Sequence, residues 1–372
     1  MTSANSAPSA DSRTAPGPPR RTLDTRARIA LPLCAALLLG LAIHRLIVAE
    51  PAERPYTEFS GSTMGTTYSV KVATADLAEP ARTALAREIE SQLDRVNSLM
   101  SSYLPDSELS RFNRHASLDP FPLSDETIEV FRIAWQVSEM TGGAFDITVG
   151  PLVAAWGFGA TDRLPEPPTA RERLELRQRV GYRKLVLDPD RPLVTKREPR
   201  IECDLSAIAK GYGVDRVGRA ISNLGHANYL VEIGGELRAR GRKLDGLPWR
   251  VGIEQPDSQI RISRETVILR DTSLATSGDY RDYYEVDGKR VSHTIDPRAG
   301  HPIRHNLASV SVLHEQAVWA DALATALNVM GPQEGISWAE NHQIAALFLV
   351  RDDAKGFRSV ATTAFERLRA AE

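Results

Sequence analysis

Residues Ile201 to Gly225 read I-E-C-D-L-S-A-I-A-K-G-Y-G-V-D-R-V-G-R-A-I-S-N-L-G and predict a strand followed by a helix. Asp204 and Ser206 offer short oxygen-bearing side chains at the point where the helix should begin. Lys210 lies in the first turn, where a cation opposes the helix dipole unless an anionic ligand binds beside it. The alternative is an ordinary strand–turn–helix unit whose lysine points into water.

The whole chain has 372 residues, of which 42% are apolar, enough for one large domain or two closely packed ones. A formal net charge of -2 gives no support for a nucleic-acid-binding surface. The two cysteines, Cys34 and Cys203, do not suggest a disulfide framework, and the eight histidines are scattered without zinc spacing.

The N-terminal region differs in composition from the rest. Residues 1–28 form a basic arm that we expect to be disordered, because it has too few apolar residues to fold. Residues 29–49 are mainly apolar and just reach the length of a membrane-spanning helix if Arg45 extends to the far interface. A signal segment cleaved near Ala49 is the alternative. The preceding arginines predict a cytoplasmic N-terminus and an exported remainder, in which a linker at 50–58 leads to one domain at 59–372.

The stretch 141–159 reads T-G-G-A-F-D-I-T-V-G-P-L-V-A-A-W-G-F-G and combines glycines with bulky apolar residues. Glycine lets a backbone approach another group closely, so the stretch indicates contact with something flat and rigid. The alternative is a helix that stops at glycine and is followed by a turn against the core.

An acidic residue stands in the apolar helix predicted at 317–329. Asp321 and Thr325 are four residues apart and therefore share one face of that helix. A buried aspartate is unfavourable unless a cation accompanies it, and the same helix carries no Lys or Arg between Ala317 and Met330. Carboxylate and hydroxyl oxygens suit Mg²⁺. Alternatively, Asp321 caps a break or pairs with a distant arginine, and Thr325 bonds the carbonyl four residues earlier.

His293 lies in a polar loop before Pro297 and Gly300. Histidine is the residue type best suited to act as a general base near neutral pH. A loop histidine can equally well be structural or simply exposed to solvent.

Eight segments of the chain together resemble the FAD:protein FMN transferase family, also called the ApbE family. They are S-T-M-G-T-T-Y (62–68), M-S-S-Y-L-P-D-S-E-L-S-R-F-N (100–113), T-G-G-A-F-D-I-T-V-G-P-L (141–152), D-L-S-A-I-A-K-G-Y (204–212), E-I-G-G-E (232–236), S-G-D-Y (277–280), H-T-I-D-P-R-A-G-H-P (293–302) and W-A-D-A-L-A-T-A-L (319–327). They occur in the family's order between about Phe59 and Gly331, which makes the series far more specific than any one segment.

The resemblance implies an α+β fold, related to the T-fold, with mixed, mainly antiparallel sheets and packed helices, preceded by an N-terminal membrane segment. It also implies a Mg²⁺-dependent enzyme that moves the FMN moiety of FAD onto a Ser or Thr hydroxyl of an acceptor protein and releases AMP. The alternatives are an FAD pyrophosphatase and a periplasmic flavin-binding protein without turnover. The implied acceptor is a subunit of a membrane redox complex or an exported flavoprotein. The implied location is the bacterial inner membrane, with the catalytic domain facing the periplasm.

The family's site residues carry over position by position. The FAD site would include Met64, Tyr103, Ala144, Phe145, Asp146, Asp204, Lys210 and Ile295. Mg²⁺ would be held by Asp321, Thr325 and the backbone carbonyl of Ala207, with Ala324 close by. His293 matches the family's proposed base for the acceptor hydroxyl, and Asp321 is the second residue assigned to catalysis.

Overall fold

The structure is a computed structural model that describes residues 56–370 except 75, 161–165, 255, 257–262, 279–282, 287 and 353–355. The predicted arm, the apolar segment at 29–49 and most of the linker lie outside these residues. The helices of the described part include none that is long and apolar enough to span a membrane. The first strand begins at Thr57, two residues before the predicted start of the domain.

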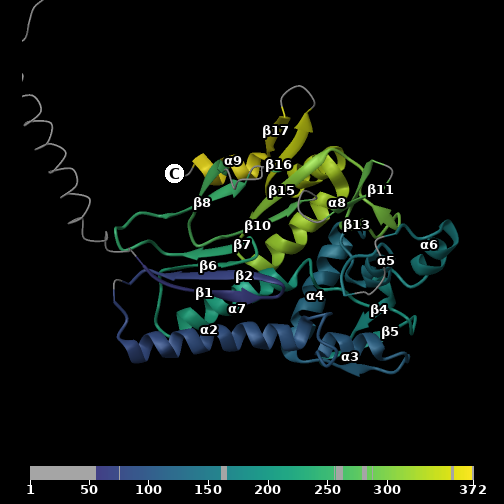
Figure 1. The fold of residues 1–372 in the computed structure, drawn as a ribbon, viewed down its shortest axis with the longest axis horizontal. Helices are drawn as coiled ribbons and strands as arrows, with labels where there is room; N and C mark the ends of the chain where they lie inside the picture. Colours follow the sequence, from purple (N-terminus) through teal and green to yellow (C-terminus); the bar gives the residue numbers. More distant parts are fainter. Residues whose placement is uncertain are drawn as a thin grey trace, which may run out of the picture. The chain divides into compact units, whose positions relative to one another are not determined.

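An eight-stranded sheet runs through the middle of the domain in the order β1-β2-β6-β7-β10-β15-β16-β17 (Figure 1). The strands are β1 (Thr57–Thr63), β2 (Thr66–Val72), β6 (Tyr229–Ile233), β7 (Glu236–Arg240), β10 (Ser273–Gly278), β15 (Leu307–His314), β16 (Ala345–Asp352) and β17 (Gly356–Ala361). Neighbouring strands in this sheet pair antiparallel throughout the described residues. Residues 57–72 form a hairpin around Met64 and Gly65, both at positive φ.

Shorter antiparallel sheets surround the large one. They comprise β3 (Phe121–Pro122), β5 (Leu193–Lys196) and β4 (Leu185–Leu187) in one sheet, β8 (Trp249–Glu254) with β9 (Ser263–Leu269), β11 (Tyr283–Val286) with β12 (Lys289–Ser292), and β13 (Ile295–Asp296) with β14 (His301–Pro302). The mainly antiparallel α+β architecture expected from the sequence is therefore confirmed for the described residues.

The rest of the regular structure in the described residues is helical. They are α2 (Glu79–Met100), α3 (Glu108–Arg114), α4 (Asp125–Met140), α5 (Gly150–Ala155), α6 (Ala170–Arg177), α7 (Ala209–Asn223), α8 (Ala317–Asn341) and α9 (Thr363–Ala370), with 3-10 turns η1 (Ile147–Val149) and η2 (Tyr182–Lys184). Ser107 and Ser124 cap α3 and α4, because each side-chain oxygen accepts a backbone N–H of the first turn. Trp135 on α4 is 37% exposed.

The start of α7 differs from the prediction. Asp204 and Ser206 do not cap it: Asp204 Oδ1 accepts the backbone N–H of Ser206 at 2.8 Å and its hydroxyl at 2.5 Å, which closes a turn before the helix. The N-cap is Ile208, whose side chain offers no hydrogen bond. The backbone N–H of Gly211 in the first turn instead donates a hydrogen bond of 2.9 Å to Asp321 Oδ2. Helix α8 therefore supplies the cap that the local sequence lacks.

The two faces of the large sheet carry different layers. On one face, α2 and α7 pack with β1, β2 and β6 in a common apolar cluster, and Figure 1 shows both helices along that side. On the other face, Trp249 and Leu269 of the β8–β9 pair and Phe365 of α9 form a second cluster with the sheet. Glycine is required where α7 meets α8, because a Cβ on Gly211 would lie 2.3 Å from the carbonyl oxygen of Ala317. This contact places the start of α7 against Asp321.

Candidate functional site

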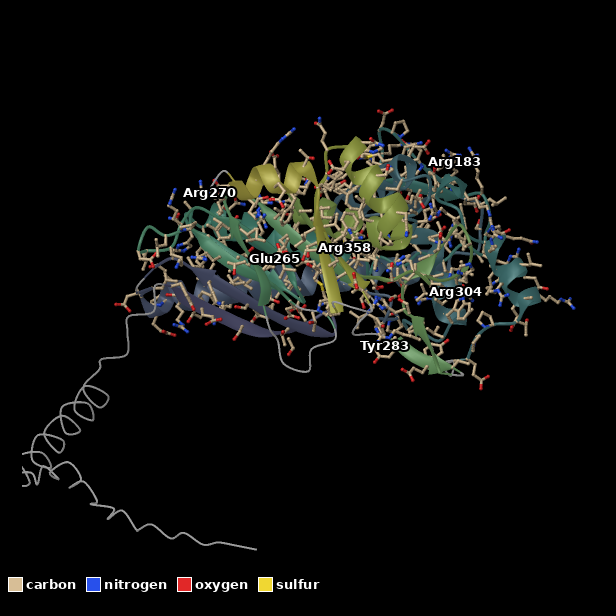
Figure 2. The ribbon with its side chains drawn as sticks, turned by 90° about the horizontal axis from the view of Figure 1, so that it is seen from above. Arg183, Glu265, Arg270, Tyr283, Arg304 and Arg358 are labelled. Atoms are coloured by element: carbon tan, nitrogen blue, oxygen red, sulfur yellow. The ribbon has the colours of Figure 1, made fainter. Side chains whose placement is uncertain are left out.

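A cavity of about 1060 Å³ opens where the start of α7, the inner face of α8, the β6–β7 turn, β10 and the glycine-rich stretch meet. Most of the predicted site residues line it, although they come from distant parts of the sequence. They are Tyr103, Ala144, Phe145, Asp146, Asp204, Ala207, Lys210, His293, Ile295, Asp321 and Thr325. Tyr283, also on the wall, belongs to the β11–β12 ribbon that stands at the margin of the domain in Figure 2.

Two predicted site residues are absent from this wall. Met64 lies in the β1–β2 turn and packs against the apolar core. It lies close to Gly213, since a Cβ on Gly213 would be 3.1 Å from Met64 Cε. Ala324 is fully buried among the core residues of α8. A role for either residue in FAD or Mg²⁺ binding stays a prediction.

Charged side chains meet at the α7–α8 contact. Lys210 Nζ lies 3.8 Å from Asp321 Oδ1 and 3.7 Å from Glu236 Oε1, and donates a hydrogen bond of 3.0 Å to the carbonyl oxygen of Ser206. Asp321 therefore has a cationic neighbour on another helix. The sequence of α8 alone could not show this partner, because Lys210 belongs to α7.

The pKa values of this cluster reflect burial and mutual attraction. Burial raises the pKa of Asp321, although the Lys210 ammonium and the Gly211 N–H oppose the shift. Burial likewise raises the pKa of Glu236, to about 8. Burial alone would lower the pKa of Lys210, but the charges of Asp321 and Glu236 outweigh it and raise that pKa above its usual value. The cluster thus binds protons tightly when no other cation is present.

The oxygens on this wall suit a hard divalent cation. Asp321 and Thr325 lie one turn apart on α8, and the Thr325 hydroxyl is 2.9 Å from that of Ser277 on β10. Ala207, whose carbonyl was predicted as a ligand, lines the same cavity. No group of three or more His, Cys, Asp or Glu side chains able to hold a metal occurs among the described residues. A cation here would therefore combine the donors named with water or phosphate oxygens, as Mg²⁺ commonly does.

The glycine-rich stretch is organised by Asp146. Its Oδ1 accepts the backbone N–H and hydroxyl of Thr148, at 2.8 and 2.6 Å, and its Oδ2 accepts the N–H of Tyr182 at 2.8 Å. These bonds shape the loop that presents Ala144 and Phe145 at the cavity wall. At Gly150 the close approach is to the chain itself, since a Cβ would lie 2.8 Å from the carbonyl oxygen of Glu202. The alternative, a helix that stops at glycine, holds at the end of α4, where Gly142 and Gly143 follow at positive φ.

An aromatic group forms another part of the wall. The ring centroids of Phe158 and Tyr284 are 5.2 Å apart, and those of Phe158 and His293 are 6.4 Å apart in an edge-on arrangement. The Tyr284 hydroxyl donates to the carbonyl oxygen of Trp156 at 3.0 Å, which holds this ring in place. Phe158 belongs to the glycine-rich stretch, whereas Tyr284 was not predicted as a site residue, because only the fold brings it beside Phe158.

The ApbE family model matches residues 64–348. This chain belongs to the ApbE family. The FAD:protein FMN transferase of Vibrio cholerae serotype O1 is 43% identical over 328 residues, covering 88% of this chain and 97% of the relative. The FAD:protein FMN transferase of Haemophilus influenzae is 40% identical over 335 residues, covering 89% of this chain and 96% of the relative. The FAD:protein FMN transferase of Escherichia coli K12 is 35% identical over 341 residues, covering 91% of this chain and 96% of the relative.

Solved structures of the ApbE family agree with this assignment. The flavin transferase ApbE from Vibrio cholerae superposes with a TM-score of 0.76 at 43% identity, covering 84% of this chain and 98% of that one. The apo form of the Pseudomonas stutzeri flavinyl transferase ApbE gives a TM-score of 0.78 at 40% identity, covering 85% and 98%. The resemblance inferred from the eight segments is confirmed.

Glu236 lines the cavity 3.7 Å from Lys210 Nζ, although it was not among the predicted site residues. It belongs to the segment E-I-G-G-E but received no role. A carboxylate directly after Gly234 and Gly235, where a strand is broken, was the available signal. Its proximity to Lys210 could not be read from that pattern.

Proposed function

We propose that this chain is a Mg²⁺-dependent FAD:protein FMN transferase. It attaches the FMN moiety of FAD to a Ser or Thr hydroxyl of an acceptor protein through a phosphoester bond and releases AMP. The observation that carries the proposal is the grouping of Lys210, Asp321 and Thr325 on one cavity wall in a chain of the ApbE family. An ammonium beside hard oxygen donors suits a diphosphate and the cation that accompanies it.

Each residue then has a defined task. Asp321, Thr325 and the Ala207 carbonyl would hold Mg²⁺, which when bound neutralises charge on the diphosphate. Lys210 binds diphosphate oxygens, and His293 takes the proton from the acceptor hydroxyl. The hydroxyl oxygen forms a bond to the phosphorus on the FMN side while the bond from that phosphorus to the bridging oxygen breaks, and AMP leaves with that oxygen. The aromatic wall of Phe158 and Tyr284 provides a surface for a flat ring.

We further propose that the enzyme acts outside the cytoplasm. The apolar segment at 29–49 and the arginines before it support a bacterial inner-membrane location with the catalytic domain facing the periplasm. The acceptor is then a membrane redox-complex subunit or an exported flavoprotein. Fractionation of cells, with the mass of the mature chain, distinguishes a retained anchor from a cleaved signal segment.

A transfer assay tests the activity. The full-length chain is incubated with FAD, Mg²⁺ and a candidate acceptor, and the products are a fluorescent acceptor in a denaturing gel and one AMP for each flavin attached. A chelator should stop the reaction, and Mg²⁺ should restore it. Free FMN and AMP without labelled acceptor would instead indicate a pyrophosphatase. Tight FAD binding without either product would indicate a flavin-binding protein.

Asp321→Ala tests the proposed cation site. We expect transfer to fall by about 100-fold or more, because one of few cation ligands is lost. Glu139→Gln is a control, since this carboxylate, which pairs with Arg183 and accepts the Tyr182 hydroxyl, does not line the cavity. Transfer by the Asp321 variant at nearly the wild-type rate would refute the assignment of the cation to this carboxylate.

A further inference from the structure

Glu236 is a buried carboxylate with one unused oxygen. It is the first residue of β7, its side chain is 4% exposed, and it lines the cavity. Its Oε1 lies 3.7 Å from Lys210 Nζ, whereas its Oε2 has no hydrogen-bond partner in the part of the chain that the structure describes. Such a group is unfavourable in a folded protein, and its presence at a cavity wall requires an explanation.

When both carboxylates are ionised, the charges around Lys210 do not balance. One ammonium stands between two carboxylates, at 3.7 Å from Glu236 and 3.8 Å from Asp321, and neither separation is short enough for a direct hydrogen bond. The ammonium is therefore shared. A divalent cation at Asp321 would repel the ammonium from that side, and Glu236 would remain as its counterion.

The β6–β7 turn is shaped to keep these two side chains together. Gly234 and Gly235 have φ of 61° and 107°, a region that favours glycine. A Cβ on Gly234 would lie 2.8 Å from Thr66 Cγ2 and 3.3 Å from Lys210 Cδ. The missing side chain thus gives the lysine stem room to cross the turn directly beside Glu236.

We propose that Glu236 is a positioning residue that holds the Lys210 ammonium at the cavity wall while the Asp321 carboxylate binds a divalent cation. Ammonium and cation then act side by side on the diphosphate. Without Glu236, the ammonium pairs with Asp321 alone and competes with the cation for it. The inference rests on the proposed function, because it requires a cation at Asp321.

The test is a double-mutant cycle read out by direct binding of Mn²⁺, which accepts the same oxygen ligands as Mg²⁺. Free Mn²⁺ is followed by electron paramagnetic resonance during titration of the full-length chain loaded with FAD. We expect Glu236→Gln, which preserves size and removes charge, to weaken Mn²⁺ binding by about tenfold, but by less than about twofold in a Lys210→Met background. Glu139→Gln, the same change outside the cavity, should leave binding unaltered.

Three other binding results would overturn the inference, and one of them would overturn the proposed function as well. An equal loss in both backgrounds would show that Glu236 acts on the cation directly and would overturn the inference. Unchanged binding by Glu236→Gln, with normal binding by the wild type, would overturn it while leaving the proposed function intact. A wild-type chain that binds no Mn²⁺ would overturn both. Thermal unfolding checks that each variant is folded, and if Glu236→Gln is not, Glu236→Asp replaces it, because the shorter side chain withdraws the carboxylate from Lys210.

Discussion

Two lysines of this domain, one half-buried and one fully buried, differ in what surrounds their ammonium groups. Lys210 faces a cavity and two carboxylates, which raise its pKa. The Nζ of Lys196 lies 4.5 Å from the centre of the Phe112 ring and donates to the carbonyl oxygen of Asn113 at 3.2 Å, and burial lowers its pKa. Lys196 is the more deeply buried of the two, with 1% exposed. Burial by itself therefore does not mark a functional lysine, whereas carboxylates at a cavity wall do.

The largest expected effect separates the two lysines by activity. Lys210→Met should reduce FMN transfer by about 100-fold or more, because the ammonium acts on charge that develops in the transition state. Lys196→Met should leave transfer within about twofold, since a buried charged group can often be replaced by an apolar one of similar size. Single-turnover transfer rates measure both. Similar losses in the two variants would remove the distinction.

His293→Asn tests the proton transfer proposed for the cavity that Lys210 and His293 both line. We expect transfer to slow by about 100-fold, the usual contribution of a general base, while FAD affinity changes little. Transfer rates and the quenching of flavin fluorescence on binding give the two quantities. Equal losses in rate and affinity would contradict the role of His293 as the base.

Stability should depend on pH through the carboxylate beside Lys210. The pKa of Glu236 is about 8 in the folded protein and 4.5 as an ordinary glutamate, so the folded state holds this proton more tightly. The contribution is fully present below about pH 4.5 and is lost as the pH rises through about 8, on the order of a few kcal/mol. Urea unfolding between pH 5 and 9 in a chelator should show the decline in wild type and a flatter profile in Glu236→Gln. Identical profiles would contradict the assignment.

The smallest expected effect concerns the surroundings of Lys196. Phe112→Leu removes the aromatic ring beside this ammonium and should lower the free energy of unfolding by about 1 kcal/mol more than Phe131→Leu does. Phe131 is a matched control, because its ring packs edge-on against Phe112 in the same apolar core. Urea unfolding measures the difference, and transfer should be unchanged in both variants. A selective loss of transfer in Phe112→Leu would connect Lys196 to the cavity.

Much of this protein could be predicted because the relevant signals are local. The caps at Ser107 and Ser124 depend on one hydroxyl and a backbone N–H three residues later. Asp321 and Thr325 share a face because a helix turns every few residues. The eight segments identified the family because their residue types and order can be read without coordinates.

The charged cluster, in contrast, depends on packing between distant segments. Asp321 caps α7 at Gly211, 110 residues away, and this contact exists only because a glycine lets α7 approach α8 closely. Glu236 reaches Lys210 through the β6–β7 turn, whose glycines leave room for the lysine stem. Side-chain periodicity describes one element at a time, so it shows which residues share a face. It does not show which two faces meet, because this follows from how the apolar surfaces of all elements are buried together.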